Sequence, residues 1–406
     1  MPPPPFALRL SRAEFIALVA ALMALNALAI DVLLPALPYM GEALHVAEAN
    51  HRQLVIGAYM IGFGTAQLAI GPISDRYGRR APLLIGIAVY VFAALCAVAA
   101  PDFQTLLLLR LLQGVGAAGT RVIAISVVRD CFAGRAMAEV MSLAFMVFMV
   151  IPIVAPGIGQ VILLTGPWQY VFLFMAGLAA VVGVWAYIRL PETLSLAQRR
   201  PLTLASVLDG FRIVLSNRQA LSYGAAGVFL FGAVMGFITT AQQIYVGIYG
   251  LGPLFPLAFA AMAGLMSLSA FLNSRMVMRF GMRRMSHFAI VVHVLFSAVL
   301  LACSLVFFVP LWLFFLLLAL IMFMFGWSSS NMNSLSMEPL GAVAGTASSV
   351  FGFTQVVGGA LIGSYTGQHF DGTITPTAAG YLLTGLGALA CCLVAERGRL
   401  FGVGAR

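Results

Sequence analysis

Long apolar stretches dominate this chain and are separated by short polar segments. Most of them reach the roughly 20 residues that a helix needs to cross the hydrocarbon core of a bilayer. Of the 406 residues, 62% are hydrophobic and 9% are charged, whereas about a quarter of the residues of a soluble domain are charged. The stretches lack the alternation of barrel strands, so helices must satisfy the backbone. The sequence therefore predicts an all-α integral membrane protein that spans the bilayer many times.

The charge of the chain follows the predicted spans. All basic residues are arginines, and the formal net charge is +9. Apart from Arg52, Arg110 and Arg121, the arginines fall near the two termini or in alternate loops. Positively charged loops stay on the cytoplasmic side, which predicts a multi-pass protein of the bacterial inner membrane with both termini in the cytoplasm. This distribution also argues against a nucleic-acid-binding domain.

Several classes of function lack support in the sequence. The five cysteines are scattered over apolar segments and one loop, so neither a disulfide framework nor a metal site is expected. The metalloprotease, serine-hydrolase and P-loop motifs do not occur in the chain, which argues against an enzyme. The first residues lead directly into a full-length span, and no cleavable signal peptide is expected.

A polar and basic stretch divides the apolar segments into two sets. We predict a first bundle over residues 1–194, a cytoplasmic linker with an amphipathic surface helix over 195–218, and a second bundle over 219–406. The expected spans of the first bundle are about 13–36, 50–70, 81–100, 103–127, 137–163 and 168–189. Those of the second bundle begin near residues 220, 255, 285, 311, 340 and 378.

The segment from Gly71 to Arg80, with the sequence GPISDRYGRR, is a charged hinge between two predicted spans. Gly71–Pro72 is expected to end the preceding helix, because proline lacks the N–H that a further turn needs. Asp75 would then lie near the start of the next helix, where the helix dipole favours a carboxylate. A similar pattern follows half a chain later, with Met278 at the place of Asp75. This internal repeat predicts two six-helix halves.

The hinge resembles the loop between the second and third helices of the major facilitator superfamily, a large family of secondary transporters. The resemblance implies a gate on the cytoplasmic side, in which the aspartate and the arginines latch the two halves together. The residues concerned are Gly71, Asp75, Arg76, Gly78, Arg79 and Arg80. A positive loop that only fixes the membrane topology is the simpler alternative.

Asp31 is the only acid that we place inside a span, and a carboxylate there is a candidate functional group because its burial is costly. Counted from neighbouring prolines at about 1.5 Å per residue, Asp31 and Arg110 lie at similar depths and could form a pair. Burial raises the proton affinity of a carboxylate and a nearby arginine lowers it, so proton coupling through these two residues is expected. Alternatively, Asp31 only caps the wet end of its helix.

Arg110 belongs to the segment LRLLQG, residues 109–114. This segment resembles the arginine-containing fourth-helix motif of proton-driven facilitators, which implies that Arg110 tunes proton transfer. Arg121 follows almost three helical turns later and therefore lies on the same face at a different depth. It either lines the cavity or extends along the helix to reach the lipid headgroups.

The predicted fifth span contains Pro152, Ala155, Pro156 and Gly159. It is similar to the Gly-Pro-x-x-Gly-Gly signature of exporters in this superfamily, in which small residues and proline allow close packing and a bend. Ala155 and Gln160 replace two of the glycines, so the match is partial. A proline-kinked helix with no further role is the alternative.

Further stretches at residues 30–38, 129–130, 137–142, 338–339 and 344–349 resemble the Bcr/CflA branch, which comprises drug/proton antiporters of the bicyclomycin and chloramphenicol resistance type. The resemblance implies a major facilitator fold of twelve transmembrane helices that exports small, largely apolar compounds. We expect a monomer that uses the proton gradient and needs no cofactor or metal. A dedicated exporter or importer of one metabolite on the same fold is the alternative.

Polar side chains in apolar spans usually face the interior of a bundle, where they find partners, and methionine offers an adaptable apolar surface. On this basis the candidates for the substrate cavity are Asn26, Tyr59, Phe63, Gln67, Gln113, Arg121, Met146, Gln242, Asn331 and Gln355.

Overall fold

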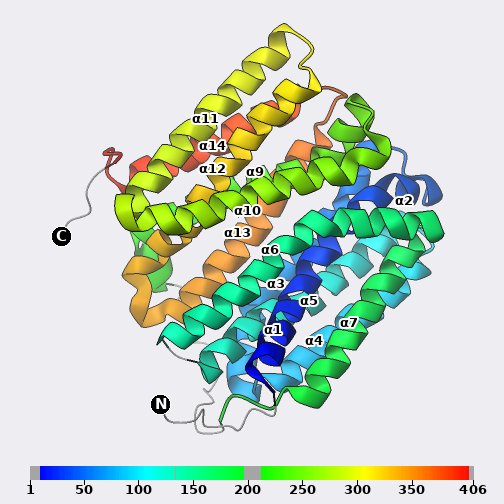
Figure 1. The fold of residues 1–406 in the computed structure, drawn as a ribbon, viewed down its shortest axis with the longest axis vertical. Coiled ribbons are helices and arrows are strands. Elements are labelled where there is room, and N and C mark those ends of the chain that lie inside the picture. Colours follow the sequence, from blue (N-terminus) through cyan, green and yellow to red (C-terminus); the bar gives the residue numbers. More distant parts are fainter. Residues whose placement is uncertain (1–9, 133, 196–211, 402–406) are drawn as a thin grey trace. The chain divides into compact units, whose positions relative to one another are not determined.

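The computed structural model describes residues 10–132, 134–195 and 212–401. Within them the chain is helical, with turns and short loops and no strand. It divides into two compact units, unit 1 with residues 1–203 and unit 2 with residues 204–406 (Figure 1). The predicted linker over 195–218 lies mostly outside the described residues, although residues 212–216 are helical.

Six long helices form the described part of unit 1. Ser11 and Asp102 cap two of them, each side chain accepting a hydrogen bond from a backbone N–H three residues later, as is usual at helix N-termini. The elements are α1 (Arg12–Asp31), η1 (Leu34–Ala36), α2 (Leu37–Ala43), η2 (Ala49–Gln53), α3 (Leu54–Tyr77), α4 (Arg80–Val98), α5 (Phe103–Cys131), α6 (Gly134–Thr165) and α7 (Gln169–Arg189).

The described part of unit 2 repeats this arrangement with six long helices of its own. Asn217 caps the first of them through the N–H of Ala220. The elements are α9 (Arg218–Gln242), η4 (Gln243–Ile248), η5 (Gly252–Leu254), α10 (Phe255–Phe280), α11 (Met282–Val306), α12 (Leu311–Met337), η6 (Glu338–Val343), α13 (Ala344–Gln368) and α14 (Thr375–Ala395).

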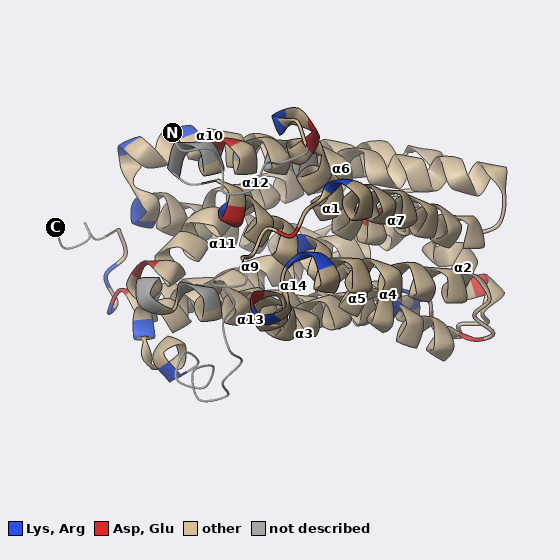
Figure 2. Cartoon of the chain, turned by 90° about the horizontal axis from the view of Figure 1, so that it is seen from below, with Lys and Arg blue, Asp and Glu red and all other residues tan. Residues whose placement is uncertain are grey.

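Eleven helical segments of the described residues are long and apolar enough to cross a membrane, and a shorter apolar segment, Met149–Thr165, lies within α6. Most charged residues lie at helix ends or in loops (Figure 2). The predicted all-α membrane protein with twelve helices in two repeats is therefore confirmed, and the helices begin within a few residues of the predicted positions.

Two predicted helix boundaries are wrong. α3 continues through Gly71–Pro72 and ends only at Gly78, whose φ of 93° suits glycine. The missing N–H of Pro72 does not suffice to end the helix. Asp75 therefore lies in the last turn of α3 and not at the start of α4. The first span also runs further than predicted, because the chain continues through η1 and α2 to Ala43.

The backbones of α3 and α5 touch at two glycines. A Cβ atom on Gly114 would lie 2.0 Å from the carbonyl oxygen of Tyr59, and one on Gly62 would lie 2.0 Å from that of Leu111. Any side chain at either position would therefore separate the helices. Small residues allow this close approach between membrane helices. The contact places Tyr59 of α3 beside Arg110 of α5.

Candidate functional site

Arg110 is fully buried, and its guanidinium group joins three helices of unit 1. It donates hydrogen bonds to the backbone carbonyls of Val55 on α3, at 3.2 Å, and Ala29 on α1, at 2.9 Å. A third hydrogen bond, of 2.6 Å, goes to the side-chain oxygen of Gln113. All of these acceptors are uncharged. Among the described residues, Arg110 has no carboxylate within ion-pair distance.

The aromatic ring of Tyr59 provides the remaining contact of Arg110. The guanidinium carbon lies 4.4 Å from the ring centroid, a distance at which the electron-rich face of a ring attracts a cation. The Tyr59 hydroxyl donates a 2.8 Å hydrogen bond to the side chain of Asn26 on α1. The ring of Phe63 stacks on that of Tyr59 with the centroids 6.3 Å apart. Two of the nominated cavity residues, Tyr59 and Gln113, thus contact Arg110, and a third, Asn26, binds Tyr59.

Asp31 is the last residue of α1 and is 4% exposed. It forms no hydrogen bond or ion pair with any other residue that the structure describes. The direct pairing with Arg110 that similar depths suggested is not formed, because Arg110 binds the carbonyl of Ala29, two residues earlier. Asp31 is thus a buried carboxylate without a cation, on the same helix end that Arg110 contacts.

α6 packs closely against the segment that follows Asp31. Ala155 is fully buried, and a Cβ atom on Gly159 would lie 2.1 Å from the carbonyl oxygen of Val32. Pro152 and Pro156 both lie inside the continuous helix α6. The small residues of the partial exporter signature therefore bring the backbone of α6 to the end of α1.

The other nominated cavity residues of unit 1 lie at separate places. Gln67 of α3 is 7% exposed, and its side-chain nitrogen has no hydrogen-bond partner among the described residues. Arg121 of α5 is half-buried. Met146 of α6 is 62% exposed. Only Phe63 adjoins the cluster around Arg110, through its stacking on Tyr59.

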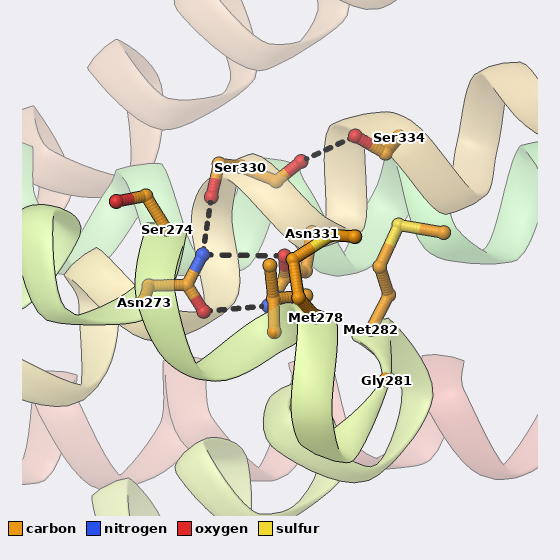
Figure 3. A pocket seen from close by; sticks show the side chains of 9 residues that line it. Asn273, Ser274, Met278, Gly281, Met282, Ser330, Asn331 and Ser334 are labelled. Atoms are coloured by element: carbon orange, nitrogen blue, oxygen red, sulfur yellow. Dashed lines mark hydrogen bonds between the residues drawn. The ribbon is translucent and has the colours of Figure 1, made fainter.

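Within unit 2, Asn331 pairs with an asparagine that the sequence analysis did not identify. Asn273 of α10 and Asn331 of α12 exchange side-chain hydrogen bonds of 3.3 and 3.0 Å, and Asn273 also donates to the hydroxyl of Ser330 (Figure 3). Both asparagines line a cavity of about 500 Å³ whose other walls include Met278 and Met282. This cavity combines an uncharged polar floor with thioether side chains.

The two remaining candidates of unit 2 are half-buried. Gln242 is the last residue of α9. Gln355 of α13 lies against Gly227 of α9, with its nitrogen 3.7 Å from the position of a Cβ atom there. Neither of them belongs to the cavity beside Asn331.

The predicted gating residue Arg79 is the centre of a buried charge network. Arg79 is 2% exposed and donates to the carboxylates of Asp130 at 2.8 Å and Asp75 at 2.6 Å. It also donates to the hydroxyl of Ser74 at 2.8 Å. Burial alone would lower the pKa of this guanidinium, but the hydrogen bonds and charges of Asp130 and Asp75 outweigh it and raise the pKa. The network ties the ends of α3 and α5 to the start of α4.

Glu192, after α7, completes this network through the backbone. Its carboxylate accepts hydrogen bonds from the N–H groups of Arg79, at 2.8 Å, and Arg80, at 3.2 Å. The Arg80 side chain donates to the carbonyl of Tyr187 at 2.5 Å and lies over its ring. Arg76, by contrast, is exposed. Of the six hinge residues, Arg79 therefore forms most of the buried contacts.

Unit 2 has a different charge network at the matching position. Met278 and Met282 are in register with Asp75 and Arg79, and Gly281 has the positive φ, 80°, that Gly78 has in unit 1. The cation is now Arg283, which is in register with Arg80. Figure 3 shows both methionines at the cavity beside Asn331.

Arg283 binds two carboxylates from distant parts of unit 2. It donates to Glu396, after α14, at 2.9 Å and to Glu338, after α12, at 3.1 Å. Glu338 also accepts a hydrogen bond from Gln219 on α9. Unit 2 thus also has an arginine bound by acids from the ends of other helices, although Met278 replaces the aspartate found in unit 1.

Asp130, Glu192, Glu338 and Glu396 were not predicted from the sequence as partners of these arginines. All four share one signal, since each is an acid within a few residues of a helix end. Alternate loops of a helical bundle lie on one side of the membrane, so the acids of these helix ends had to face the hinges. That rule would have predicted their approximate location.

A comparison with family models decides the classification. The model described as "Major Facilitator Superfamily" matches residues 19–363. The chain belongs to the major facilitator superfamily. It is therefore a multi-pass membrane transporter that acts on small molecules, and members of this family are not enzymes.

Curated relatives extend over most of the chain. An uncharacterized MFS-type transporter of Bacillus subtilis is 29% identical over 388 residues, 94% of each chain. A bicyclomycin resistance protein homolog of Haemophilus influenzae is 29% identical and covers 89% of this chain and 91% of its own. The multidrug resistance protein MdtL of Klebsiella pneumoniae is 30% identical, with coverage of 84% and 85%. These names support the Bcr/CflA-type resemblance.

Solved structures show the same fold at low sequence identity. A D-xylose–proton symporter superposes with a TM-score of 0.71 at 14% identity, over 95% of this chain and 97% of its own. A bacterial homolog of the human lysosomal transporter Spinster, in an inward-facing and unoccupied conformation, gives 0.71 at 13% identity, over 95% of each chain.

Proposed function

We propose that this transporter exports small, largely apolar, drug-like compounds across the bacterial inner membrane in exchange for protons. The observation that carries the proposal is Asp31, a buried carboxylate with no cation bound to it among the described residues. A carboxyl group in an apolar bundle is more stable when it is protonated. Asp31 can therefore bind and release a proton as its surroundings change, and the multidrug and bicyclomycin resistance names of the relatives favour drugs as the substrates.

Arg110 would couple this proton to movement of the helices. Its guanidinium contacts α1 through Ala29 and α3 through Val55. When Asp31 loses its proton, the new negative charge attracts Arg110, and the two side chains can approach each other. When Asp31 is protonated, Arg110 returns to the carbonyl groups. Such an exchange of partners would link proton release to a change in the packing of α1 on α5.

The charge network around Arg79 would serve as the gate on the cytoplasmic side, with both termini on that side. Arg79 holds the ends of α3 and α5 together through its contacts with Asp75 and Asp130. No cofactor is required in this scheme, because the proton gradient supplies the energy, and a monomer suffices.

Replacing Asp31 with asparagine is expected to abolish proton exchange, because the amide cannot release a proton. Everted membrane vesicles energised by respiration, with a pH-sensitive dye inside, measure this directly as dissipation of the gradient on addition of a compound. Lipophilic cations, chloramphenicol-like neutral compounds and metabolites should be tested as a panel. We expect several unrelated compounds to dissipate the gradient in the natural protein, and none in Asp31→Asn.

Asp102→Asn is the matched control, since this acid is an exposed helix cap outside the bundle. It should transport normally. A response to a single metabolite would instead favour a dedicated transporter, which the partial exporter signature with Ala155 and Gln160 also permits. If Asp31→Asn still exchanges protons for substrate, the proposed coupling is wrong.

A further inference from the structure

The charge of Arg110 lacks a counter-ion among the described residues, although an unpaired charge inside a membrane protein is costly. Three uncharged acceptors and the ring of Tyr59 contact it, and the buried Tyr90 of α4 lies close enough to interact with its charge. The ring of Tyr59 adds the attraction of its electron-rich face to these hydrogen bonds, since the guanidinium carbon lies 4.4 Å from the ring centroid. Tyr59 is itself fully buried, so little water screens this attraction.

The position of Tyr59 is fixed by contacts that do not involve Arg110. Its hydroxyl donates to Asn26 at 2.8 Å, and its ring is stacked on that of Phe63 at an interplanar angle of 7°. The backbone contact at Gly114 holds its carbonyl against α5. The ring therefore has one orientation, with its face toward the guanidinium group.

We propose that Tyr59 is a positioning residue that takes the place of a carboxylate at Arg110 and so keeps Asp31 free to bind a proton. This inference rests on the proposed proton coupling. Without the ring, the nearest charge available on α1 is Asp31, two residues beyond the carbonyl that Arg110 already binds. Arg110 would then pair with Asp31 permanently and hold it in the charged form.

The first test compares Tyr59→Leu, Tyr59→Phe and Phe172→Leu in the vesicle assay at a series of pH values. Tyr59→Phe keeps the ring and should retain the natural pH profile. Tyr59→Leu should shift the midpoint of proton exchange to lower pH by about one unit, since a neighbouring opposite charge stabilises a carboxylate by that amount or more. Phe172→Leu removes an equally buried ring of unit 1, on α7, that packs on Trp168 and not on Tyr59, and it should leave the midpoint unchanged.

The second test is a double-mutant cycle on the purified protein, which does not depend on transport. Asp31→Asn should change the melting temperature little in the natural protein and in Phe172→Leu, because Asp31 has no partner there among the described residues. In the Tyr59→Leu background, Asp31→Asn should lower the melting temperature by several degrees more, because Asp31 is then the counter-ion of Arg110. Equal effects in all three backgrounds would overturn the role of Tyr59. If the natural protein exchanges no protons in the vesicle assay, only the proposed function is overturned.

A second and independent observation concerns the segment after α14 in unit 2. The backbone N–H of Phe401 donates a 3.0 Å hydrogen bond to Nδ1 of His287 on α11, so this nitrogen carries no proton. Nε2 of His287 lies 3.2 Å from the hydroxyl of Tyr223, which donates its own proton to Glu396 at 2.5 Å. Nε2 must therefore donate to Tyr223. This geometry requires a neutral imidazole.

Two residues of this segment have backbone angles that side chains disfavour. Arg397 has a φ of 53° and Phe401 a φ of 63°, and both are left-handed conformations for residues with a Cβ atom. Contacts with His287 hold the segment in place, including the ring of Phe401, which packs edge-on against the imidazole.

We propose that residues 396–401 form a tail clamp that opens when His287 is protonated. A proton on Nδ1 would point at the N–H of Phe401, and the two donors would repel each other. The groups that face His287 are Tyr223 from α9, Arg283 from its own helix, and Glu396 from the tail, with Cys392 of α14 packed on Tyr223. Glu396 accepts the protons of Tyr223 and Arg283 on one oxygen, whereas the two imidazole nitrogens face Tyr223 and Phe401. The charge of Glu396 therefore does not remove the clash between a second imidazole proton and the N–H of Phe401.

Hydrogen exchange of the purified full-length protein tests the clamp, with rates corrected for the intrinsic effect of pH. The amide of Phe401 should lose at least about tenfold protection between pH 7.5 and pH 5.5. In His287→Gln, which cannot be charged, protection should not depend on pH. His293→Gln is the matched control, since His293 is buried on the same helix and binds the carbonyl of Tyr381, and it should behave like the natural protein. Constant protection in the natural protein, or pH dependence that survives in His287→Gln, would overturn the clamp.

Discussion

Gly114→Leu is expected to have a large effect on the folding of unit 1. A Cβ atom at this position would lie 2.0 Å from the carbonyl oxygen of Tyr59 and 2.8 Å from the amide nitrogen of Phe63. Both neighbours are backbone atoms, so no rotamer change relieves the clash and α3 must move away from α5. Overpacking usually costs about 1–3 kcal/mol, and we expect more here, with a fall in melting temperature of roughly 10 °C.

Gly177→Leu provides the control for this substitution. Gly177 lies in α7, and among the described residues no atom beyond its chain neighbours and its own helix backbone lies within 4 Å of the position of its Cβ atom. Thermal unfolding in detergent should therefore show little change for Gly177→Leu. Any Gly114→Leu protein that still folds should also lose transport, because the ring of Tyr59 and the guanidinium of Arg110 move apart when the two helices separate. A melting temperature within 2 or 3 degrees of the natural value, as expected for about 1 kcal/mol or less, would contradict the close contact.

Arg79→Met is expected to have the second large effect, because it leaves two carboxylates without their cation. Removing one partner of a buried ion pair costs about 3–5 kcal/mol. Since the Asp75 side chain is 41% exposed and water can solvate it, we expect about 2–3 kcal/mol. Thermal unfolding measures the loss. If this network is the gate, transport by Arg79→Met should decrease as well.

The second repeat suggests a double variant that should recover part of the stability lost in Arg79→Met. Met278 and Met282 stand in register with Asp75 and Arg79, so unit 2 tolerates methionine at both positions together. The double variant Asp75→Met, Arg79→Met should therefore be more stable than Arg79→Met alone, because one of the two unpaired carboxylates is gone. If the double variant is less stable, the two residues do not form the pair that their 2.6 Å contact indicates.

Much of the fold could be predicted from the sequence, because membrane spans depend on the length and polarity of local stretches. The hinge repeat correctly indicated two halves, and Gly78 and Gly281 share a positive φ. The end of α3 could not be predicted from Gly71–Pro72, since tertiary contacts stabilise a helix beyond a single missing hydrogen bond. The Asp130 contact of Arg79 is one such contact.

The residues of the candidate site could be predicted from the sequence, but the contacts between them could not. Asn26, Tyr59, Gln113 and Arg110 were all identified from polar or charged character in apolar spans. Their arrangement depends on the backbone contact between α3 and α5, which two glycines permit and no periodicity reveals. For the same reason the depth argument suggested an Asp31–Arg110 pair, whereas the guanidinium binds carbonyl groups.

The burial of Arg110 also constrains how the protein is made. α5 carries both Arg110 and Arg121, and an arginine at the centre of a lone helix opposes membrane insertion by about 2.5–3.5 kcal/mol. The groups that bind Arg110 outside its own helix lie on α1 and α3, which leave the ribosome earlier. Insertion of α5 is therefore expected to follow the arrival of these two helices and to use them as a receptor, so that assembly of the first repeat begins during translation.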